Sequence, residues 1–294
     1  MEQNSTKINI NWYPGHMAKT KREINEKLNL IDIIFEVIDS RIPYTSKNKE
    51  IEAMTKNKPR ILIMTKKDLC DMEVTSKWVK YYEELGYNVV LVDLIHDKNI
   101  NNILNITNKL AQDVNEKRKQ KGLKPRKVRI LILGIPNVGK STLINKLVEK
   151  KATNVGNRPG VTKSLESISI NNDLELLDTP GILWPKLTGE KIGLNLASMT
   201  AIKEEILNKE IVAINIINTL NKLYPNRLNE RYKISKKDDI LEILDEIGSH
   251  IGAIRNGEVD YEKVYTTILK DLREGFFGGV TFDEFENWKI WKNR

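Results

Sequence analysis

Short apolar runs alternate with amphipathic stretches along the first two thirds of the chain. Apolar runs with at most two polar residues each, typical of strands buried on both faces, lie at residues 31–38, 60–64, 88–92 and 128–133. Apolar residues recur at helical spacing over residues 18–30, 75–85, 100–117 and 140–149. This alternation predicts an α/β fold with a mostly parallel sheet and helices on both faces. Residues 165–170 and 174–177 are expected to form a hairpin that brings Asp178 to a strand end.

The pattern changes beyond about residue 187. Helical spacing dominates over residues 202–223, 238–247 and 261–272, with little strand signal. A length of 294 residues has room for two domains. We therefore expect an α/β domain over residues 1–186 and a small all-helical domain over residues 187–294.

Three short motifs supply candidate chemistry, and their order is unusual. Residues 134–141 read Gly-Ile-Pro-Asn-Val-Gly-Lys-Ser and match the phosphate-binding loop G-x-x-x-x-G-K-[ST], between a predicted strand and a predicted helix. Asp178-Thr179-Pro180-Gly181 looks like the magnesium-side loop of a GTPase, and Thr65-Lys66-Lys67-Asp68 looks like its guanine reader. The guanine reader normally follows the other two motifs, but here it precedes them. The sequence therefore predicts a circularly permuted P-loop GTPase.

The phosphate loop and the magnesium ligands follow from two of these motifs. Glycines let backbone N–H groups turn towards phosphate oxygens at the positive end of the following helix. Lys140 would reach the β- and γ-phosphates, while Ser141 and Asp178 would hold Mg²⁺, the latter through water. Thr162 is the candidate second hydroxyl ligand, and its alternative is a Gly/Pro-rich loop that holds no metal. The expected nucleotide contacts outside the base pocket are Ile135, Pro136, Asn137, Val138, Gly139, Lys140, Ser141, Thr142, Thr162 and Gly181, whose N–H would face the γ-phosphate.

Asp68 is the predicted base reader. A carboxylate at this position accepts two hydrogen bonds from the N1–H and N2–H₂ groups of guanine, and adenine offers no matching pair of donors. Lys66 would lay its stem along the ring, and Thr65 stands where related GTPases usually have Asn. The loop that completes the base pocket is expected near residues 93–95, where no motif matches.

Composition bears on partners and compartment. The net charge of +8 is compatible with a nucleic-acid partner and equally with a lysine-rich solvated surface. Residues 117–127 carry seven basic residues and no acid, which suits a phosphate-contacting linker or a solvated one. A single cysteine, Cys70, excludes an internal disulfide and favours a reducing compartment. No apolar run approaches the roughly 20 residues of a membrane span, so we expect a cytoplasmic protein without membrane contact.

With these residues in hand, the chain resembles the YlqF/RbgA group of circularly permuted, ribosome-associated GTPases. The resemblance spans most of the chain and rests on Trp-Tyr-Pro-Gly-His-Met at 12–17, Asp-Ser-Arg-Ile-Pro at 39–43, residues 134–143, Arg-Pro-Gly-Val-Thr at 158–162, and residues 177–186. It implies a ribosome-stimulated GTPase that binds GTP and GDP with Mg²⁺ and acts late in assembly of the large ribosomal subunit. Its implied partners are the subunit precursor, rRNA and ribosomal proteins, and a monomer is the default state.

The hydrolytic step needs a substitute for a missing glutamine. Ras-like enzymes place a glutamine after the Asp-x-x-Gly motif, but Ile182 and Leu183 stand here and neither side chain can hydrogen-bond a water. The resemblance points to His16, whose neutral imidazole could accept a hydrogen bond from the attacking water. A structural or an RNA-contacting role is the alternative for His16. The resemblance also suggests a K⁺ ion held partly by Asn137, a residue that equally suits a tight loop.

Two other classes of function stay open at this point. One is a nucleotide-gated RNA-binding module with negligible hydrolysis of its own, which the missing glutamine allows. The other is an ATP-dependent nucleic-acid enzyme, against which Asp68 argues. Arg41, in a turn after a predicted strand, either links the nucleotide to the ribosome or forms a salt bridge within the fold.

Overall fold

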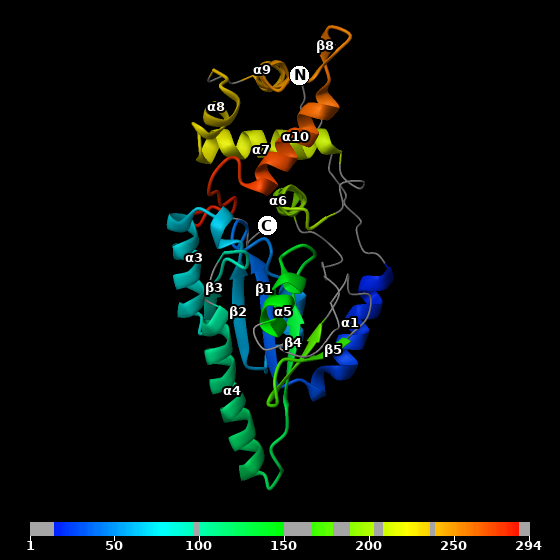
Figure 1. Cartoon of the computed structure of the whole chain (residues 1–294), viewed down its shortest axis with the longest axis vertical. Coiled ribbons are helices and arrows are strands. Elements are labelled where there is room, and N and C mark those ends of the chain that lie inside the picture. Colours follow the sequence, from blue (N-terminus) through cyan, green and yellow to red (C-terminus); the bar gives the residue numbers. More distant parts are fainter. Residues whose placement is uncertain are drawn as a thin grey trace.

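A sheet covered by helices forms one end of the molecule, and a group of helices forms the other (Figure 1). The structure is a computed structural model that describes residues 15–96, 100–149, 166–178, 189–202, 208–235 and 239–287. None of the helices in these ranges is long and apolar enough to cross a membrane.

The order in which the chain forms the strands changes direction at the centre of the sheet. Its strands are β1 (Ile33–Asp39), β2 (Arg60–Thr65), β3 (Asn88–Leu91), β4 (Val128–Leu133), β5 (Glu166–Ser169) and β6 (Leu174–Asp178). They are ordered β3-β2-β1-β4-β6-β5, and the described neighbours are parallel except for the antiparallel pair β5 and β6. The chain runs outward from β1 to β3 and then returns to β4 beside β1. In open α/β sheets, ligands bind outside the carboxyl ends of the strands at such a reversal.

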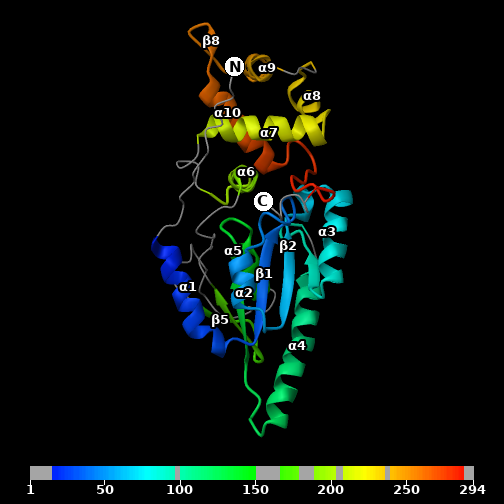
Figure 2. The same cartoon turned by 180° about the vertical axis from the view of Figure 1, so that it is seen from behind.

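Helices cover both faces of this sheet (Figures 1 and 2). They are α1 (Gly15–Lys27), α2 (Lys49–Met54), α3 (Met72–Glu84), α4 (Ile100–Gln120) and α5 (Lys140–Glu149), with short 3-10 turns η1 (Leu28–Leu30) and η2 (Lys67–Leu69). Successive side chains of a strand point to opposite faces. Phe35 of β1 therefore shares an apolar cluster with residues of α4 and α5, whereas Ile34 clusters with residues of α1 and α2, and Ile38 with residues of α3. All seven residues of β1 are buried, as the apolar run predicts.

The C-terminal part is helical apart from one small hairpin. Its elements are α6 (Glu190–Ser198), α7 (Lys209–Leu223), α8 (Arg227–Tyr232), α9 (Ile240–His250), β7 (Ile254–Arg255), β8 (Glu258–Val259) and α10 (Tyr261–Glu274). The hairpin turn is Asn256-Gly257, with φ of 53° and 85°, a pair that adopts positive φ readily. Helix α7 begins later than residue 202, because the Asn208 side chain caps it by accepting a hydrogen bond from the Glu210 N–H.

The segment after α10 returns to the sheet and hydrogen-bonds to the backbone just beyond the carboxyl ends of β1 and β2. The Val280 N–H donates to the Leu69 carbonyl at 3.0 Å, and the Phe282 N–H donates to the Arg41 carbonyl at 2.7 Å. A Cβ at Gly279 would lie 2.4 Å from the carbonyl oxygen of Cys70, so the backbones approach too closely for any other residue. The two parts of the chain therefore share a well-packed junction. The predicted boundary at residues 186 and 187 lies outside the described residues.

Candidate nucleotide-binding site

The predicted phosphate loop forms an arch between the end of β4 and the start of α5. Asn137 and Gly139 turn the chain with φ of 58° and 97°. A Cβ at Gly134 would lie 2.4 Å from the Val37 carbonyl oxygen, so this position also requires glycine. The Lys140 ammonium donates to the carbonyls of Gly134 at 3.1 Å and Ile135 at 2.9 Å. The lysine thus lies inside the curve of the loop, at the N-terminus of α5, where backbone N–H groups and the helix dipole favour a phosphate.

Thr65 connects the base-reading loop directly to the phosphate loop. It ends β2 and is fully buried. Its hydroxyl donates to the Val138 carbonyl at 2.6 Å, across 73 residues of sequence. The threonine that departs from the usual asparagine therefore has a structural role at the junction of the two loops.

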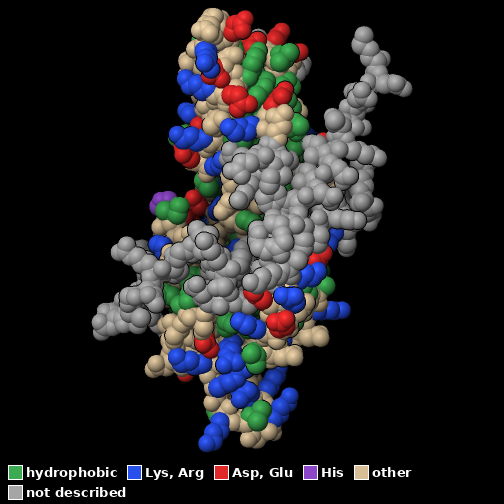
Figure 3. Space-filling view, turned by 90° about the vertical axis from the view of Figure 1, so that its right-hand side faces the viewer, with side chains coloured by type: hydrophobic (Ala, Val, Ile, Leu, Met, Phe, Trp, Pro, Cys, Tyr) green, Lys and Arg blue, Asp and Glu red, His purple; other side chains and the backbone are tan. Residues whose placement is uncertain are grey.

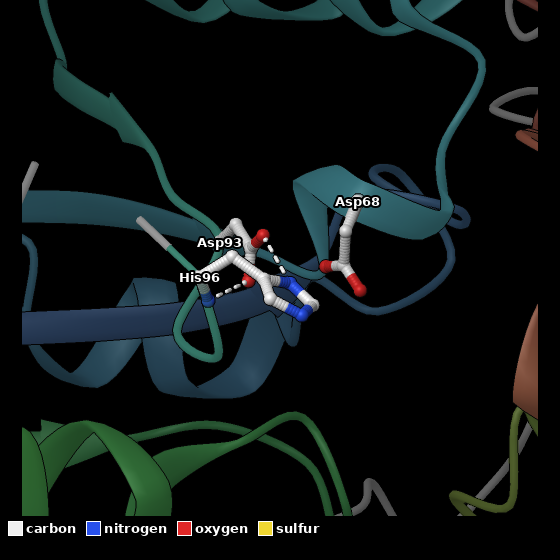
Figure 4. Close-up of side chains that lie close together, drawn as sticks. All are labelled: Asp68, Asp93 and His96. Carbon is white, nitrogen blue, oxygen red and sulfur yellow. Dashed lines mark hydrogen bonds and ion pairs between the residues drawn. The ribbon is translucent and has the colours of Figure 1, made fainter. Parts of the chain in front are cut away.

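Asp68 lies beside a loop that the sequence located but matched to no motif (Figure 4). Carboxylate oxygens of Asp68 and Asp93 and a ring nitrogen of His96 all lie within 4.8 Å of one another. Asp93 closes this loop by accepting hydrogen bonds from the backbone N–H groups of Ile95 at 2.7 Å and His96 at 3.0 Å. Burial alone would raise the pKa of Asp93, but the His96 and Ile95 N–H groups lower it below the ordinary value. An aspartate two residues after β3 that caps its own turn is a sequence signal that could have identified this loop.

A buried ion-pair network lies behind the base-reading loop. The Arg41 guanidinium binds both oxygens of Asp39, at 3.0 and 2.9 Å, and the Lys66 ammonium lies 2.9 Å from Asp39 Oδ2. Burial opposes the charge of Asp39, but Arg41 and Lys66 outweigh burial and hold the pKa of Asp39 well below its usual range. Arg41 also donates to the Leu272 carbonyl of α10 at 3.5 Å. Arg41 is thus the salt-bridge partner that the sequence allowed, and it also contacts the helical part.

The phosphate loop contacts the helical part as well. The Asn137 side-chain amide donates to the Thr200 carbonyl at 2.7 Å, just after α6. Thr200 has a positive φ of 62°, an uncommon conformation for a β-branched residue. Asn137, which is expected to help hold K⁺, is therefore anchored to the C-terminal part through its side-chain amide.

One buried carboxylate fixes the junction between the two parts. Asp283 accepts hydrogen bonds from the Thr45 backbone N–H at 2.7 Å, the Thr45 hydroxyl at 2.6 Å and the Asn195 amide at 3.2 Å. It is fully buried, and burial raises its pKa to about 6 even though these donors favour the charged form.

The metal-binding and catalytic predictions are placed only in part. Ser141 and Thr142 are exposed in the first turn of α5, and Asp178 is the last residue of β6, which pairs with β4. Parallel strands end at the same edge of a sheet, so Ser141 and Asp178, two of the three expected Mg²⁺ ligands, lie on the edge that carries the phosphate loop. Hydroxyl and carboxylate oxygens are hard donors that suit this cation. His16 lies in the first turn of α1, but its side chain, the Asp178 side chain, Thr162 and Gly181 lie outside the described residues.

Comparisons with known proteins agree with this arrangement. A family model described as a 50S ribosome-binding GTPase matches residues 129–255, and one described as an RsgA GTPase matches residues 33–188. The second match includes both the base-reading loop and the phosphate loop in the order found here.

Curated relatives match over nearly the whole chain. A Ribosome biogenesis GTPase A from Bacillus licheniformis is 44% identical over 95% of this chain and 99% of the relative. A protein of the same name from Priestia megaterium is also 44% identical, over 94% of this chain and 97% of the relative. The crystal structure of GNP-bound YlqF from T. maritima has a similar fold, with a TM-score of 0.64 and 24% identity over 90% of this chain and 98% of that chain.

Proposed function

This chain belongs to the ribosome biogenesis GTPase A family, and we propose that it hydrolyses GTP as an assembly factor acting late in maturation of the large ribosomal subunit. The observation that carries the proposal is the meeting of the base-reading loop and the phosphate loop at one sheet edge. They are joined there by the hydrogen bond from Thr65 to Val138. We also propose that it acts in the cytoplasm, in contact with ribosomal RNA and ribosomal proteins.

Guanine selectivity comes from Asp68. Its carboxylate is exposed at the edge of the sheet, beside the loop that Asp93 closes. Two donors of guanine satisfy this acceptor, whereas adenine leaves it unpaired. Because Lys66 pairs with Asp39 in a buried network, the loop that carries Asp68 is held in place before any nucleotide binds.

The triphosphate and its magnesium ion occupy the other half of the site. The backbone N–H groups of residues 135–142 other than Pro136, together with the Lys140 ammonium, would neutralise the phosphates, and we propose that the Gly181 N–H faces the γ-phosphate. Ser141, Thr162 and Asp178 would hold Mg²⁺, which would supply positive charge to neutralise the phosphates.

His16 is the proposed group that orients the attacking water. It lies in the first turn of α1, and Ile182 and Leu183 leave no hydrogen-bonding side chain at the position where Ras-like enzymes have a glutamine. A neutral imidazole accepts the hydrogen bond that the water must donate. We also propose that a K⁺ ion binds near the side-chain oxygen of Asn137. The Nδ2 group of the same side chain donates to the Thr200 carbonyl, and this leaves the side-chain oxygen to face the ion.

Two hydrogen bonds place the helical part where it can respond to nucleotide. One joins Asn137 in the phosphate loop to Thr200, and the other joins Arg41, next to the base-reading network, to Leu272. Binding of GTP at the loops therefore changes the support of α6 and α10, and this coupling makes the contact with pre-ribosomal RNA depend on GTP.

Multiple-turnover GTP hydrolysis with and without large-subunit precursors tests the proposal. We expect slow hydrolysis by the chain alone and a large increase on addition of the precursors, together with co-sedimentation under a GTP analogue but not under GDP. GTP-dependent co-sedimentation without any stimulated hydrolysis would favour the alternative, a nucleotide-gated RNA-binding module. Equal hydrolysis with and without precursors, and no co-sedimentation, would contradict both.

A further inference from the structure

The second half of α4 and the segment after it project from the sheet, at the end of the molecule opposite the helical part (Figure 1). The buried side chains of α4 all lie between Ile100 and Ala111. The part of the helix after Ala111 therefore has no fully buried side chain. We refer to residues 117–127 as the basic projection. Lysine and arginine side chains gather at this end of the surface (Figure 3).

The arginines of the basic projection hold its backbone in shape. The Arg118 guanidinium donates twice to the Lys124 carbonyl, at 3.2 Å from both Nε and Nη2, and so closes the turn after α4. Arg126 binds both oxygens of Asp32 at 2.9 and 3.0 Å, which ties the returning strand to the sheet. Asn115 exchanges two hydrogen bonds of 3.2 Å with the backbone of Arg126. These hydrogen bonds therefore hold the backbone of the basic projection in a defined conformation.

The lysines of the basic projection are all exposed, and the Lys127 ammonium donates to the Ser169 hydroxyl at 3.0 Å. The five exposed lysines are Lys117, Lys119, Lys121, Lys124 and Lys127. The nearest acids in sequence on the N-terminal side are Asp113 and Glu116, and residues 117–127 contain none. The dipole of α4 favours cations in its last turn, which explains Lys117 and Lys119. Lys121 and Lys124 lie beyond the end of the helix, so the dipole does not explain them.

We infer that the basic projection binds the phosphate backbone of RNA. Ammonium groups spaced along a braced arm match a ladder of phosphates, whose neutralisation releases counterions and dominates affinity for nucleic acid. The inference rests on the proposed function in taking ribosomal RNA as the partner. Helix α4, with 21 residues, is about 30 Å long. The projection therefore contacts RNA far from any site on the helical part, and the GTPase domain lies between the two.

The test compares two variants that change the net charge equally. The first is K119E/K121E/K124E in the basic projection. The control is K27E/K56E/K80E, at three exposed lysines: Lys27 on α1, Lys56 between α2 and β2, and Lys80 on α3. Binding of each to a transcript of the large-subunit rRNA is measured with a GTP analogue at several concentrations of KCl between 50 and 200 mM.

We expect the projection variant to bind the transcript at least tenfold more weakly than the control variant. The slope of log affinity against log salt should fall by about 2, because about three phosphate contacts are lost. Equal affinity and equal slope in the two variants would overturn the inference. Binding of poly-L-glutamate as tight as that of the transcript, and lost in the same variant, would assign the projection to an acidic peptide and would also overturn it.

Intrinsic activity separates this inference from the proposed function. Both variants should bind GTP and hydrolyse it at the basal rate, because none of the substituted lysines lies near the nucleotide loops. If the unaltered protein neither hydrolyses GTP nor binds subunit precursors, the proposed function fails. If it does both and the projection variant still binds the transcript like the control, only the inference about the projection fails.

Discussion

The Thr65 hydroxyl donates a hydrogen bond of 2.6 Å to the Val138 carbonyl, and this contact joins the base-reading loop to the phosphate loop. The two loops follow neighbouring regions of the sheet, on either side of β1, although 73 residues separate the two partners in sequence. Permutation of the chain changes the order in which the loops are encoded. It leaves their meeting at the carboxyl ends of the strands unchanged, because sheet order depends on pairing and not on where the chain begins.

Replacing Thr65 by valine should weaken both the fold and nucleotide binding. Valine keeps the shape of the side chain but removes the donor, and a buried acceptor left unpaired costs about 1–3 kcal/mol. We expect a loss of this size in the free energy of unfolding, measured with denaturant, and weaker GDP binding by calorimetry. Thr65→Ser keeps the hydroxyl and serves as the control. A valine variant with the stability and GDP affinity of the serine variant would show that the contact is dispensable.

Replacing Asp68 by asparagine should change the choice of nucleobase. The amide no longer accepts two hydrogen bonds from guanine, and an unpaired group of this kind costs about 1–3 kcal/mol, or roughly 10- to 100-fold in affinity. Because xanthine offers an acceptor where guanine has its N2 amino group, we expect the variant to prefer xanthosine diphosphate. Competition titrations of GDP, XDP and ADP measure this preference. Asp173→Asn, at an exposed position between β5 and β6, is the matched control. Full retention of GDP selectivity in Asp68→Asn would remove Asp68 as the base reader.

The strands and the phosphate loop were predictable because their signals are local. The apolar runs that form β1 and β4 are interrupted only by Glu36 and Arg129, and the glycines of residues 134–139 meet a requirement of the backbone itself. Helix α2 was missed because it has six residues, too few for a helical pattern, and depends on its Asn48 cap. Helix α6 was missed because six successive residues up to Ser198 are buried, so no polar face marks it.

The junction between the two parts could not be read from sequence. Thr45 and Asp283 are 238 residues apart, and nothing in the acidic C-terminal segment distinguishes the buried Asp283 from the half-buried Glu284 and the exposed Glu286. Arg41 was singled out, but only the structure shows that it binds Asp39 and Leu272 together. Contacts of this kind follow from tertiary packing, which local propensity does not encode. The roles of Thr162, Gly181 and the His16 side chain stay predictions.

Asp283 should make the stability of the junction depend on pH. Its folded-state pKa of about 6 lies above the ordinary value of 3.8, so the folded protein binds the proton more tightly than the unfolded chain. Its contribution to stability is complete below about pH 4 and is lost as the pH rises to about 6, by up to roughly 3 kcal/mol. Denaturant unfolding of the wild type and Asp283→Asn at pH 4.5 and pH 7 isolates this contribution as a difference.

Asparagine at position 283 should remove that pH dependence and leave the variant no less stable than the wild type at pH 7. Once the Asn195 amide turns by about 180°, the new side-chain amide can donate to Asn195 Oδ1, a buried oxygen without a described partner. Asp245→Asn, at an exposed position on α9, is the matched control for replacing an aspartate by asparagine. An Asp283→Asn difference that is the same at both pH values would contradict the assignment.

Replacing His16 by alanine should separate binding from hydrolysis. The side chain is proposed to orient water and to make no contact with the base, so GTP affinity should be unchanged. Turnover stimulated by subunit precursors should fall by roughly 10²- to 10⁴-fold, the usual contribution of a positioned general base. His250→Ala, at the exposed end of α9, should hydrolyse GTP like the wild type. Normal stimulated turnover in His16→Ala would refute the assignment.

A crystal structure of the protein with a non-hydrolysable GTP analogue and Mg²⁺ tests the central claim most directly. The account predicts that both Asp68 oxygens accept hydrogen bonds from guanine N1 and N2, while the triphosphate of the same nucleotide lies within the loop of residues 134–141. A nucleotide whose phosphates occupy that loop while its base lies away from Asp68 would contradict it.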